Sequence, residues 1–198
     1  MPYIIRPKRA RKLVAALFGT AMLIAAVPAA ASAACPSSPT TEALSQYGDN
    51  AAYTLLSGSS FENGAPGWSL NNAQVESGEG ANGGQGYLTI EPNGSAVSPV
   101  FCVSSEYPSF RFFAHKLGGP WWSWLSVTLR WNENGYTHEA FVSPIKHGNS
   151  WDLTPSLNLA SILPLGAPES TVNAQLVFQP RWGSAWAIDS VYIDPYSR

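Results

Sequence analysis

Two stretches decide the fold of this 198-residue chain: Ser60-Phe61-Glu62-Asn63-Gly64-Ala65-Pro66-Gly67-Trp68 and Trp186-Ala187-Ile188-Asp189-Ser190-Val191-Tyr192-Ile193-Asp194. The first sets two turn-forming pairs, Asn63-Gly64 and Pro66-Gly67, between aromatic residues. The second is rich in apolar and β-branched residues, as strands are. We expect the two stretches to be the first and last strands of one β-domain, paired at its edge. Four side chains would then seal the domain: Phe61, Trp68, Trp186 and Ile188.

Short strand signals separated by Gly-, Pro- and Asn-rich turns fill the sequence between these stretches, without a βαβ rhythm. In 109–115, alternation puts Phe110, Phe112 and Ala114 on one face and Arg111, Phe113 and His115 on the other. Short helices are expected at 41–47, ended by Gly48, and at 156–163. The pattern predicts an all-β jelly-roll β-sandwich of about eight antiparallel strands over 58–198, with short helical pieces in an N-terminal arm, 34–57, and in one connection.

The first 33 residues have the form of a signal peptide. Five basic residues precede an apolar run, and Ala31-Ser32-Ala33 gives the small-x-small pattern of a cleavage site. A retained membrane anchor is the alternative. The mature chain would carry six Lys and Arg against 13 Asp and Glu, a net charge of −7. Because nucleic acid and anionic membranes attract basic surfaces, we expect neither as a partner, and we expect a secreted monomer with no membrane insertion after cleavage.

Cys35 and Cys102 are the two cysteines of the chain. In an exported protein two cysteines most often pair, and this bridge would tie the arm to the strand around Cys102. The alternative is two free thiols. Neither a CxxC redox pair nor a zinc ligand set occurs.

Tryptophans give the strongest hint of a ligand site, since eight of them fall in the mature chain. The longest strand signal covers 121–131, and alternation divides it into two faces. One face is apolar and is expected in the core: Trp121, Ser123, Leu125, Val127, Leu129 and Trp131. The other joins two indoles to hydroxyls and a guanidinium: Trp122, Trp124, Ser126, Thr128 and Arg130.

Such a mixture suits a sugar, whose C–H face stacks on indole while its hydroxyls form hydrogen bonds. Arg111 and His115 are expected on the same sheet face, where they would add polar contacts. The alternative is that Trp122 and Trp124 pack under a loop or the arm. The three histidines are scattered and belong to no catalytic motif, so we do not expect an enzyme, and no cofactor is required.

The chain is similar to small exported actinobacterial proteins that resemble carbohydrate-binding modules and galactose-binding-like jelly-roll domains. The likeness rests on six segments: Cys35-Pro36, Tyr47-Gly48-Asp49, 60–68, Cys102-Val103, Phe110 to Ala114, and Trp186 to Tyr196. It implies a secreted sandwich that binds rather than catalyses, with an extracellular or cell-wall polysaccharide as partner. A structural or protein-interaction domain at the cell surface is the second hypothesis.

The resemblance also implies a possible structural Ca²⁺ at Glu62 and Asp189. In the resembled modules the Glu after the Phe and the Asp of the last strand commonly help to hold this ion, which takes six to eight oxygen ligands. The family often has Ile-Asp-Asp-Val where this chain has Ile188-Asp189-Ser190-Val191, so one carboxylate of that pattern is missing. The alternative is an ordinary hydrogen-bonded pair.

Overall fold

The computed structural model describes residues 35, 38–104, 107–159, 161–163 and 171–194. The predicted signal peptide, 1–33, lies outside the described residues. In the part of the chain that is described, no helix has the length and apolar character needed to cross a membrane.

Eleven strands and two 3-10 helices make up the described secondary structure. The helices are η1 (Ser45–Tyr47) and η2 (Ala81–Gly83). The strands are β1 (Thr54–Leu55), β2 (Ser69–Ser77), β3 (Gly86–Val97), β4 (Phe101–Val103), β5 (Ser109–Gly118), β6 (Leu125–Glu133), β7 (Tyr136–Ile145), β8 (Asp152–Leu153), β9 (Leu157–Asn158), β10 (Val172–Pro180) and β11 (Ala185–Asp194).

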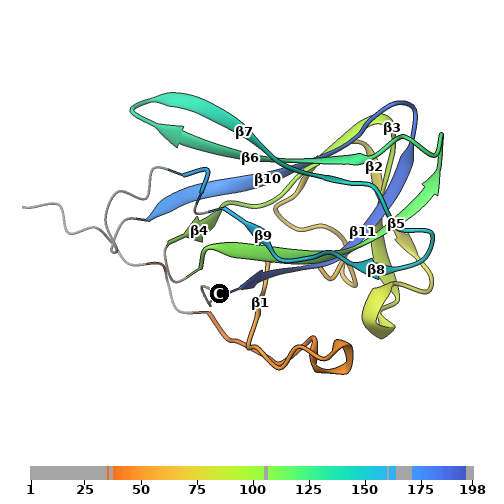
Figure 1. Cartoon of the computed structure of the whole chain (residues 1–198), viewed down its shortest axis with the longest axis horizontal. Coiled ribbons are helices and arrows are strands. Elements are labelled where there is room, and N and C mark those ends of the chain that lie inside the picture. The colour runs from red at the N-terminus through yellow and green to blue at the C-terminus, as the bar shows by residue number, and fades with distance from the viewer. Residues whose placement is uncertain (1–34, 36–37, 105–106, 160, 164–170, 195–198) are drawn as a thin grey trace, which may run out of the picture. The chain divides into compact units, whose positions relative to one another are not determined.

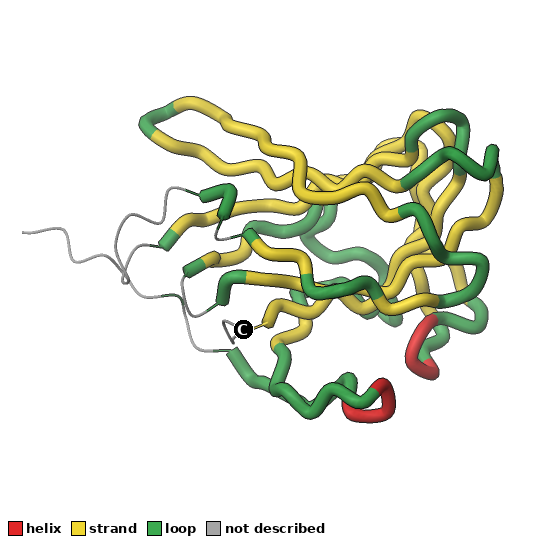
Figure 2. The backbone as a smooth tube through the Cα atoms, viewed as in Figure 1, coloured by secondary structure: helices red, strands yellow, loops and turns green. Residues whose placement is uncertain are grey.

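The strands form one antiparallel sheet that curls until two layers face each other (Figures 1 and 2). The order is β7-β6-β10-β3-β11-β5-β8, and β1, β2, β4 and β9 pair with β11, β3, β10 and β5. Strand β3 joins the layers, because its Ala96 and Val97 pair with β10 while Leu88 to Ile90 pair with β11. The predicted all-β jelly-roll sandwich is confirmed. The count exceeds about eight because four strands are only two or three residues long.

The core lies between the layers and follows the predicted alternation. Phe110, Phe112 and Ala114 of β5 join it, as do Leu125, Val127 and Leu129 of β6. Phe113, on the other face of β5, belongs to a second cluster with Leu44, Tyr53, Ala81 and Tyr192. The N-terminal arm therefore covers the outer face of β5 and β11.

The stretch 60–68 is a loop and not a strand, which corrects our first expectation. Phe61 has a φ of +56°, outside the β region, and β2 begins only at Ser69. The partner stretch, β11, lies between β3 and β5 and is not an edge strand. The first stretch still begins beside β11, because the Ser190 N–H donates at 2.7 Å to the carbonyl of Ser59, the residue before that stretch. Phe61, Trp186 and Ile188 are buried in the core, and the partly buried Trp68 packs against it, as predicted.

A bulge at Ser190 sets the faces of β11. The register between β11 and β5 shifts between Asp189 and Tyr192, and Ser190 has a φ of +49°. Ile188 and Val191 both enter the core, although alternation alone would place them on opposite faces. Asp189 thus stays on the outer face, where it can reach the loop after β2.

Besides the pairing of β1 with β11, a disulfide and an ion pair attach the arm. Cys35 and Cys102 form the predicted disulfide, with Cα atoms 5.5 Å apart. Arg111 of β5 forms an ion pair with Asp49 at 2.7 Å. The predicted helix at 41–47 is reduced to η1, and Gly48 ends it with a φ of +80°. The helix predicted at 156–163 is wrong at its start, since Leu157–Asn158 pair with β5 as β9.

Candidate ligand-binding site

Four tryptophans gather on two neighbouring loops, 119–124 and 181–184. We call Trp121, Trp122, Trp124 and Trp182 the tryptophan rim. Trp121 is 86% exposed, Trp182 64% and Trp122 56%, while Trp124 is partly buried. The indoles form two edge-to-face pairs, Trp121 with Trp122 at 5.7 Å and Trp124 with Trp182 at 6.0 Å. Indoles this exposed add little to the core, so their surface is open to a ligand.

The two loops are fastened to each other. The Arg181 N–H donates to the Trp124 carbonyl at 2.8 Å. Gly119 has a φ of +106°, and a Cβ at that position would lie 2.6 Å from the Ser184 Cα, so the close approach requires glycine. The Ser184 hydroxyl donates to the Arg181 carbonyl at 2.8 Å and closes the second loop. The rim is therefore built on a fixed backbone.

Lys116 of β5 holds the 119–124 loop through hydrogen bonds. Its Nζ donates to the Pro120 carbonyl at 2.6 Å, and the Ser123 hydroxyl donates to the same oxygen, also at 2.6 Å. The ammonium also lies 5.9 Å from the centre of the buried Trp186 ring. The ammonium thus contacts both the 119–124 loop and the buried indole of Trp186, and Lys116 is a positioning residue for the rim.

Trp182 has an unusual backbone. Its φ is +59°, and Gly183 follows at +69°. A bulky residue in the left-handed region costs about 1–2 kcal/mol relative to a right-handed conformation. Because the Trp182 side chain is mostly exposed, its burial offsets little of this conformational energy. Strain of this kind collects at functional sites, where it holds a side chain in a required position.

A cavity of about 560 Å³ opens beside the Trp124–Trp182 pair. It is lined by Asn93, Gly94, Trp124, Gln179, Pro180, Arg181 and Trp182. The Arg181 Nη2 donates to the Gln179 Oε1 at 2.8 Å, which orients both polar groups. The cavity thus joins two indoles to two amides and a guanidinium. These groups can stack on an apolar ring face and form hydrogen bonds with hydroxyls.

The prediction for the 121–131 strand is wrong at its beginning. Residues 119–124 form a turn, with the Ser123 N–H bonded to the Pro120 carbonyl, and β6 starts at Leu125. Alternation does not hold before that residue, so Trp121 is exposed and not in the core. Trp122 is exposed in the same turn, and Trp124 lines the cavity.

Arg130 lies further along β6 and does not line the cavity. Its Nε donates to the Glu139 Oε1 of β7 at 2.7 Å. The neighbouring pair on the two strands is Thr128 and Phe141, and Phe141 is 56% exposed. Arg130 is therefore part of the outer sheet surface that continues from the rim.

Arg111 and His115 are not on the tryptophan face, which corrects their predicted placement. Both lie on β5, which belongs to the layer opposite β6. Arg111 is mostly buried beneath the arm, where it contacts Asp49 and the Thr154 carbonyl. His115 packs against Trp151, with 5.5 Å between ring centres. The reason is the strand order, which alternation within one strand cannot reveal.

Glu62 and Asp189 meet at the loop that holds η2. The Glu62 Oε1 accepts from the N–H groups of Gln85 and Gly86 at 2.8 and 3.1 Å, and the Asp189 Oδ2 accepts from Ala81 at 2.8 Å. Burial raises the pKa of Asp189 to about 7, and the Glu62 charge adds to this. The pair fastens the loop. Among the described residues no group of three or more His, Cys, Asp or Glu is placed to hold a metal, and a Ca²⁺ at this pair would need further oxygen ligands from backbone carbonyls and water.

Sequence reasoning missed three polar partners of the rim, Asn93, Gln179 and Arg181, and the fourth indole, Trp182. A signal was present for Trp182, because a tryptophan directly before glycine at a turn has no core to enter. The others could not be found, since they reach the rim from β3 and from the end of β10.

No protein-family model matches the chain, and a search of curated proteins finds no match. Solved structures do match in fold. One is the CBM22-1-GH10 part of a Clostridium thermocellum endo-1,4-β-D-xylanase in complex with xylohexaose, with a TM-score of 0.52 and 14% identity over 72% of this chain and 29% of that one. Another is the CBM22-1-CBM22-2 tandem domain of a Paenibacillus barcinonensis protein, with a TM-score of 0.50 and 15% identity over 73% and 46%.

The chain spans less than half the length of either of these structures. At such low identity the matches establish the fold and nothing finer. The sandwich has the fold of carbohydrate-binding modules.

Proposed function

We propose that this protein is an exported, non-catalytic module that binds a polysaccharide at the tryptophan rim. The observation that carries the proposal is the cavity beside Trp124 and Trp182, with Arg181 and Gln179 on its wall. Trp121 and Trp122, on the same loop as Trp124, add two more exposed indoles. The two matched structures with carbohydrate-binding modules support the proposal at the level of fold.

Stacking and hydrogen bonding would share the recognition. A pyranose lying against Trp182 would cover apolar indole surface, which contributes about 25 cal/mol for each Å² removed from water. Its hydroxyls would accept from Arg181 and exchange hydrogen bonds with Gln179. Because Arg181 already bonds to Gln179 at 2.8 Å, little side-chain entropy is lost on binding.

A binding role also fits the chemistry of the rim. The groups that line its cavity are two indoles, two amides, a guanidinium, a proline and a glycine. Hydrolysis of a glycosidic bond needs two carboxyl groups across the cleft, and this lining supplies none. Two of the histidines are engaged with rings elsewhere, His115 with Trp151 and His138 with Trp131.

Affinity electrophoresis against a panel of neutral plant and microbial polysaccharides tests the proposal, followed by calorimetry with the best soluble ligand. Trp124→Ala and Trp182→Ala should each weaken binding at least tenfold. Tyr136→Ala is the matched control, because Tyr136 is 73% exposed but lies on the β6–β7 hairpin. Retention that is the same in both rim variants and the control would refute the proposal.

A protein-interaction domain at the cell surface is the second candidate. Trp121, at 86% exposure, favours it, because exposed tryptophans are common in the centre of protein interfaces. The two functions separate in one experiment. A protein partner should be retained by the wild type and lost in Trp121→Ala, with no polysaccharide retained by either.

A further inference from the structure

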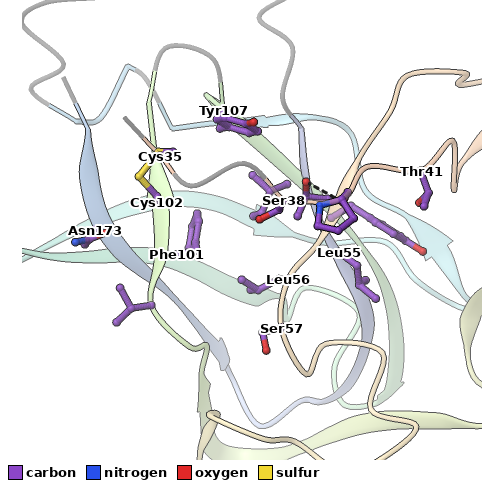
Figure 3. Close-up of a pocket in the computed structure, with 15 residues that line it drawn as sticks. Cys35, Ser38, Thr41, Leu55, Leu56, Ser57, Phe101, Cys102, Tyr107 and Asn173 are labelled. Atoms are coloured by element: carbon purple, nitrogen blue, oxygen red, sulfur yellow. Dashed lines mark hydrogen bonds between the residues drawn. A yellow bond between two sulfur atoms is a disulfide. The ribbon is translucent and has the colours of Figure 1, made fainter. Parts of the chain in front are cut away.

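A second, larger cavity lies beneath the N-terminal arm, and the tryptophan rim shares no residue with it. We call it the arm pocket. Its volume is about 690 Å³, within the range of small-molecule sites. Figure 3 shows the fifteen lining residues, with the Cys35–Cys102 disulfide and Asn173 on one side and Leu55 and Thr41 on the other.

The walls come from the arm, from β1, and from the sheet strands β4, β10 and β11. The arm supplies Cys35, Ser38, Pro39 and Thr41, while β1 and the residues after it supply Thr54 to Ser57. The remaining residues are Val100, Phe101, Cys102, Tyr107, Asn173, Tyr192 and Ile193, most of them from the ends of β4, β10 and β11. Pairing of Thr54 with Ile193 and Leu55 with Tyr192 connects the arm side to the sheet side.

The described lining is mostly apolar and includes no charged side chain. Leu56, Phe101, Tyr192 and Ile193 are each less than a tenth exposed and also belong to the hydrophobic clusters. Of the fifteen lining residues none is Asp, Glu, Lys, Arg or His, although the chain as a whole has 24 Lys, Arg, Asp and Glu residues. An ion placed here would lose its hydration with no opposite charge to replace it.

Two aliphatic side chains that line the pocket are exposed to solvent. Val100 is 61% exposed and Leu55 42%. A bound apolar ligand would cover this surface, at about 25 cal/mol for each Å² removed from water. Neutral hydroxyl groups are also present, at Ser38, Thr41, Thr54 and Ser57, and can bond to an uncharged polar end of a ligand.

We propose that the arm pocket binds a neutral ligand with an alkyl or acyl chain. The apolar walls formed by Leu56, Phe101 and Ile193 fit a hydrocarbon chain. The uncharged lining selects a neutral ligand, and the exposed Leu55 and Val100 lie where the chain would contact them. This site is independent of the polysaccharide site, so either one can be wrong while the other is right.

The test uses the whole chain and the neutral fluorophore N-phenyl-1-naphthylamine, with decan-1-ol as competitor. The fluorophore should bind with one-to-one stoichiometry and be displaced by decan-1-ol, but not by a soluble polysaccharide. Leu55→Asp and Val100→Asp should each weaken binding at least tenfold. Leu117→Asp is the matched control, because Leu117 is 44% exposed on β5 and does not line the pocket. Thermal melts confirm that each variant is folded.

Trp124→Ala and Trp182→Ala should leave fluorophore binding unchanged, which separates this site from the rim. Binding that does not saturate, or that is equal in Val100→Asp and Leu117→Asp, would overturn the proposal. So would binding that appears only after residues 195–198 are removed, since the chain's own end would then be the occupant.

Discussion

The backbone N–H of Arg181 donates to the carbonyl of Trp124 at 2.8 Å, and this bond fixes one tryptophan-bearing loop against the other. Each loop crosses from one layer of the sandwich to the other, since one joins β5 to β6 and the other joins β10 to β11. Only where both loops hold their positions do Trp124 and Trp182 meet at 6.0 Å. Any change that separates the loops should therefore reduce ligand affinity before it unfolds the protein.

Gly119→Ala tests this contact. Its new Cβ would lie 2.6 Å from the Ser184 Cα, and the φ of +106° is unfavourable for alanine. We expect the unfolding free energy to fall by about 1–3 kcal/mol and polysaccharide binding to weaken. Gly118→Ala is the control, because a Cβ there has nothing within 4 Å. Urea unfolding and calorimetry on both variants give the result, and equal effects would contradict the contact's role.

Trp182→Asn should separate binding from stability. Asparagine accepts the left-handed conformation more readily than tryptophan, so the strain at a φ of +59° is reduced. Because Trp182 is mostly exposed, little burial is lost. We expect an unfolding free energy equal to the wild type or up to about 1 kcal/mol higher, and binding at least tenfold weaker. A less stable variant with intact binding would show that Trp182 serves the fold.

Arg111→Met tests the arm attachment and the corrected place of Arg111. The change removes the cation beside Asp49, whose side chain is mostly buried. We expect the unfolding free energy to fall by about 2–3 kcal/mol, with no change in ligand binding. Arg130→Met provides a matched control. Arg130 has the same 2.7 Å contact with Glu139 but is well exposed, so its loss should stay below about 1 kcal/mol. Chemical denaturation compares the unfolding free energies of the two variants. A lower ligand affinity in Arg111→Met would show that Arg111 is a ligand-binding residue after all.

Asp189 should make stability depend on pH. Burial raises its pKa from 3.8 to about 7, so the folded protein keeps a proton that the unfolded chain releases. Between about pH 4 and pH 7 folding takes up that proton, and the unfolding free energy therefore falls as the pH rises. Denaturation from pH 4.5 to pH 8 should show this slope, and Asp189→Asn should remove much of it.

The same experiment with calcium tests the predicted cation. A bound Ca²⁺ would keep Asp189 ionised and cancel the slope, while a chelator would restore it. A slope that millimolar calcium leaves unchanged would leave Glu62 and Asp189 as a hydrogen-bonding pair for the loop.

Removing the disulfide should cost the chain more than any of these substitutions. Cys35 and Cys102 are 67 residues apart in sequence, and the chain-entropy model gives about 4 kcal/mol for a loop of this length. Cys35→Ser with Cys102→Ser should lower the unfolding free energy by that amount, and a reducing agent should do the same to the wild type. Urea unfolding with and without the reductant measures both, and a loss below about 1 kcal/mol would contradict this expectation.

Much of the fold was readable because burial follows period-two alternation inside a strand. The two faces of β5 and the core face of β6 from Leu125 onward agree with prediction. The pairing of the cysteines was also correct. The prediction failed where the chain leaves the β region, at Phe61 and in the turn at 119–124, because positive φ values and side-chain caps override local alternation.

The site was harder to predict than the fold. Trp122 and Trp124 were named, and Trp124 does line a cavity. The partners of Trp124 come from β3 and from the end of β10, and strand order decides that proximity. Arg111 and His115 were misplaced for the same reason, since a face within one strand says nothing about which layer the strand joins.

The position of β11 also constrains the order in which the molecule can be completed. It is the last described strand to be synthesised, yet it lies between β3 and β5 and also pairs with β1, the first. Until it arrives, β3 and β5 each keep an unpaired edge, the kind of edge that recruits other chains. The nascent protein would thus be most prone to aggregation just before β11 emerges, and a chaperone that shields β3 and β5 until then would raise the yield of folded molecules.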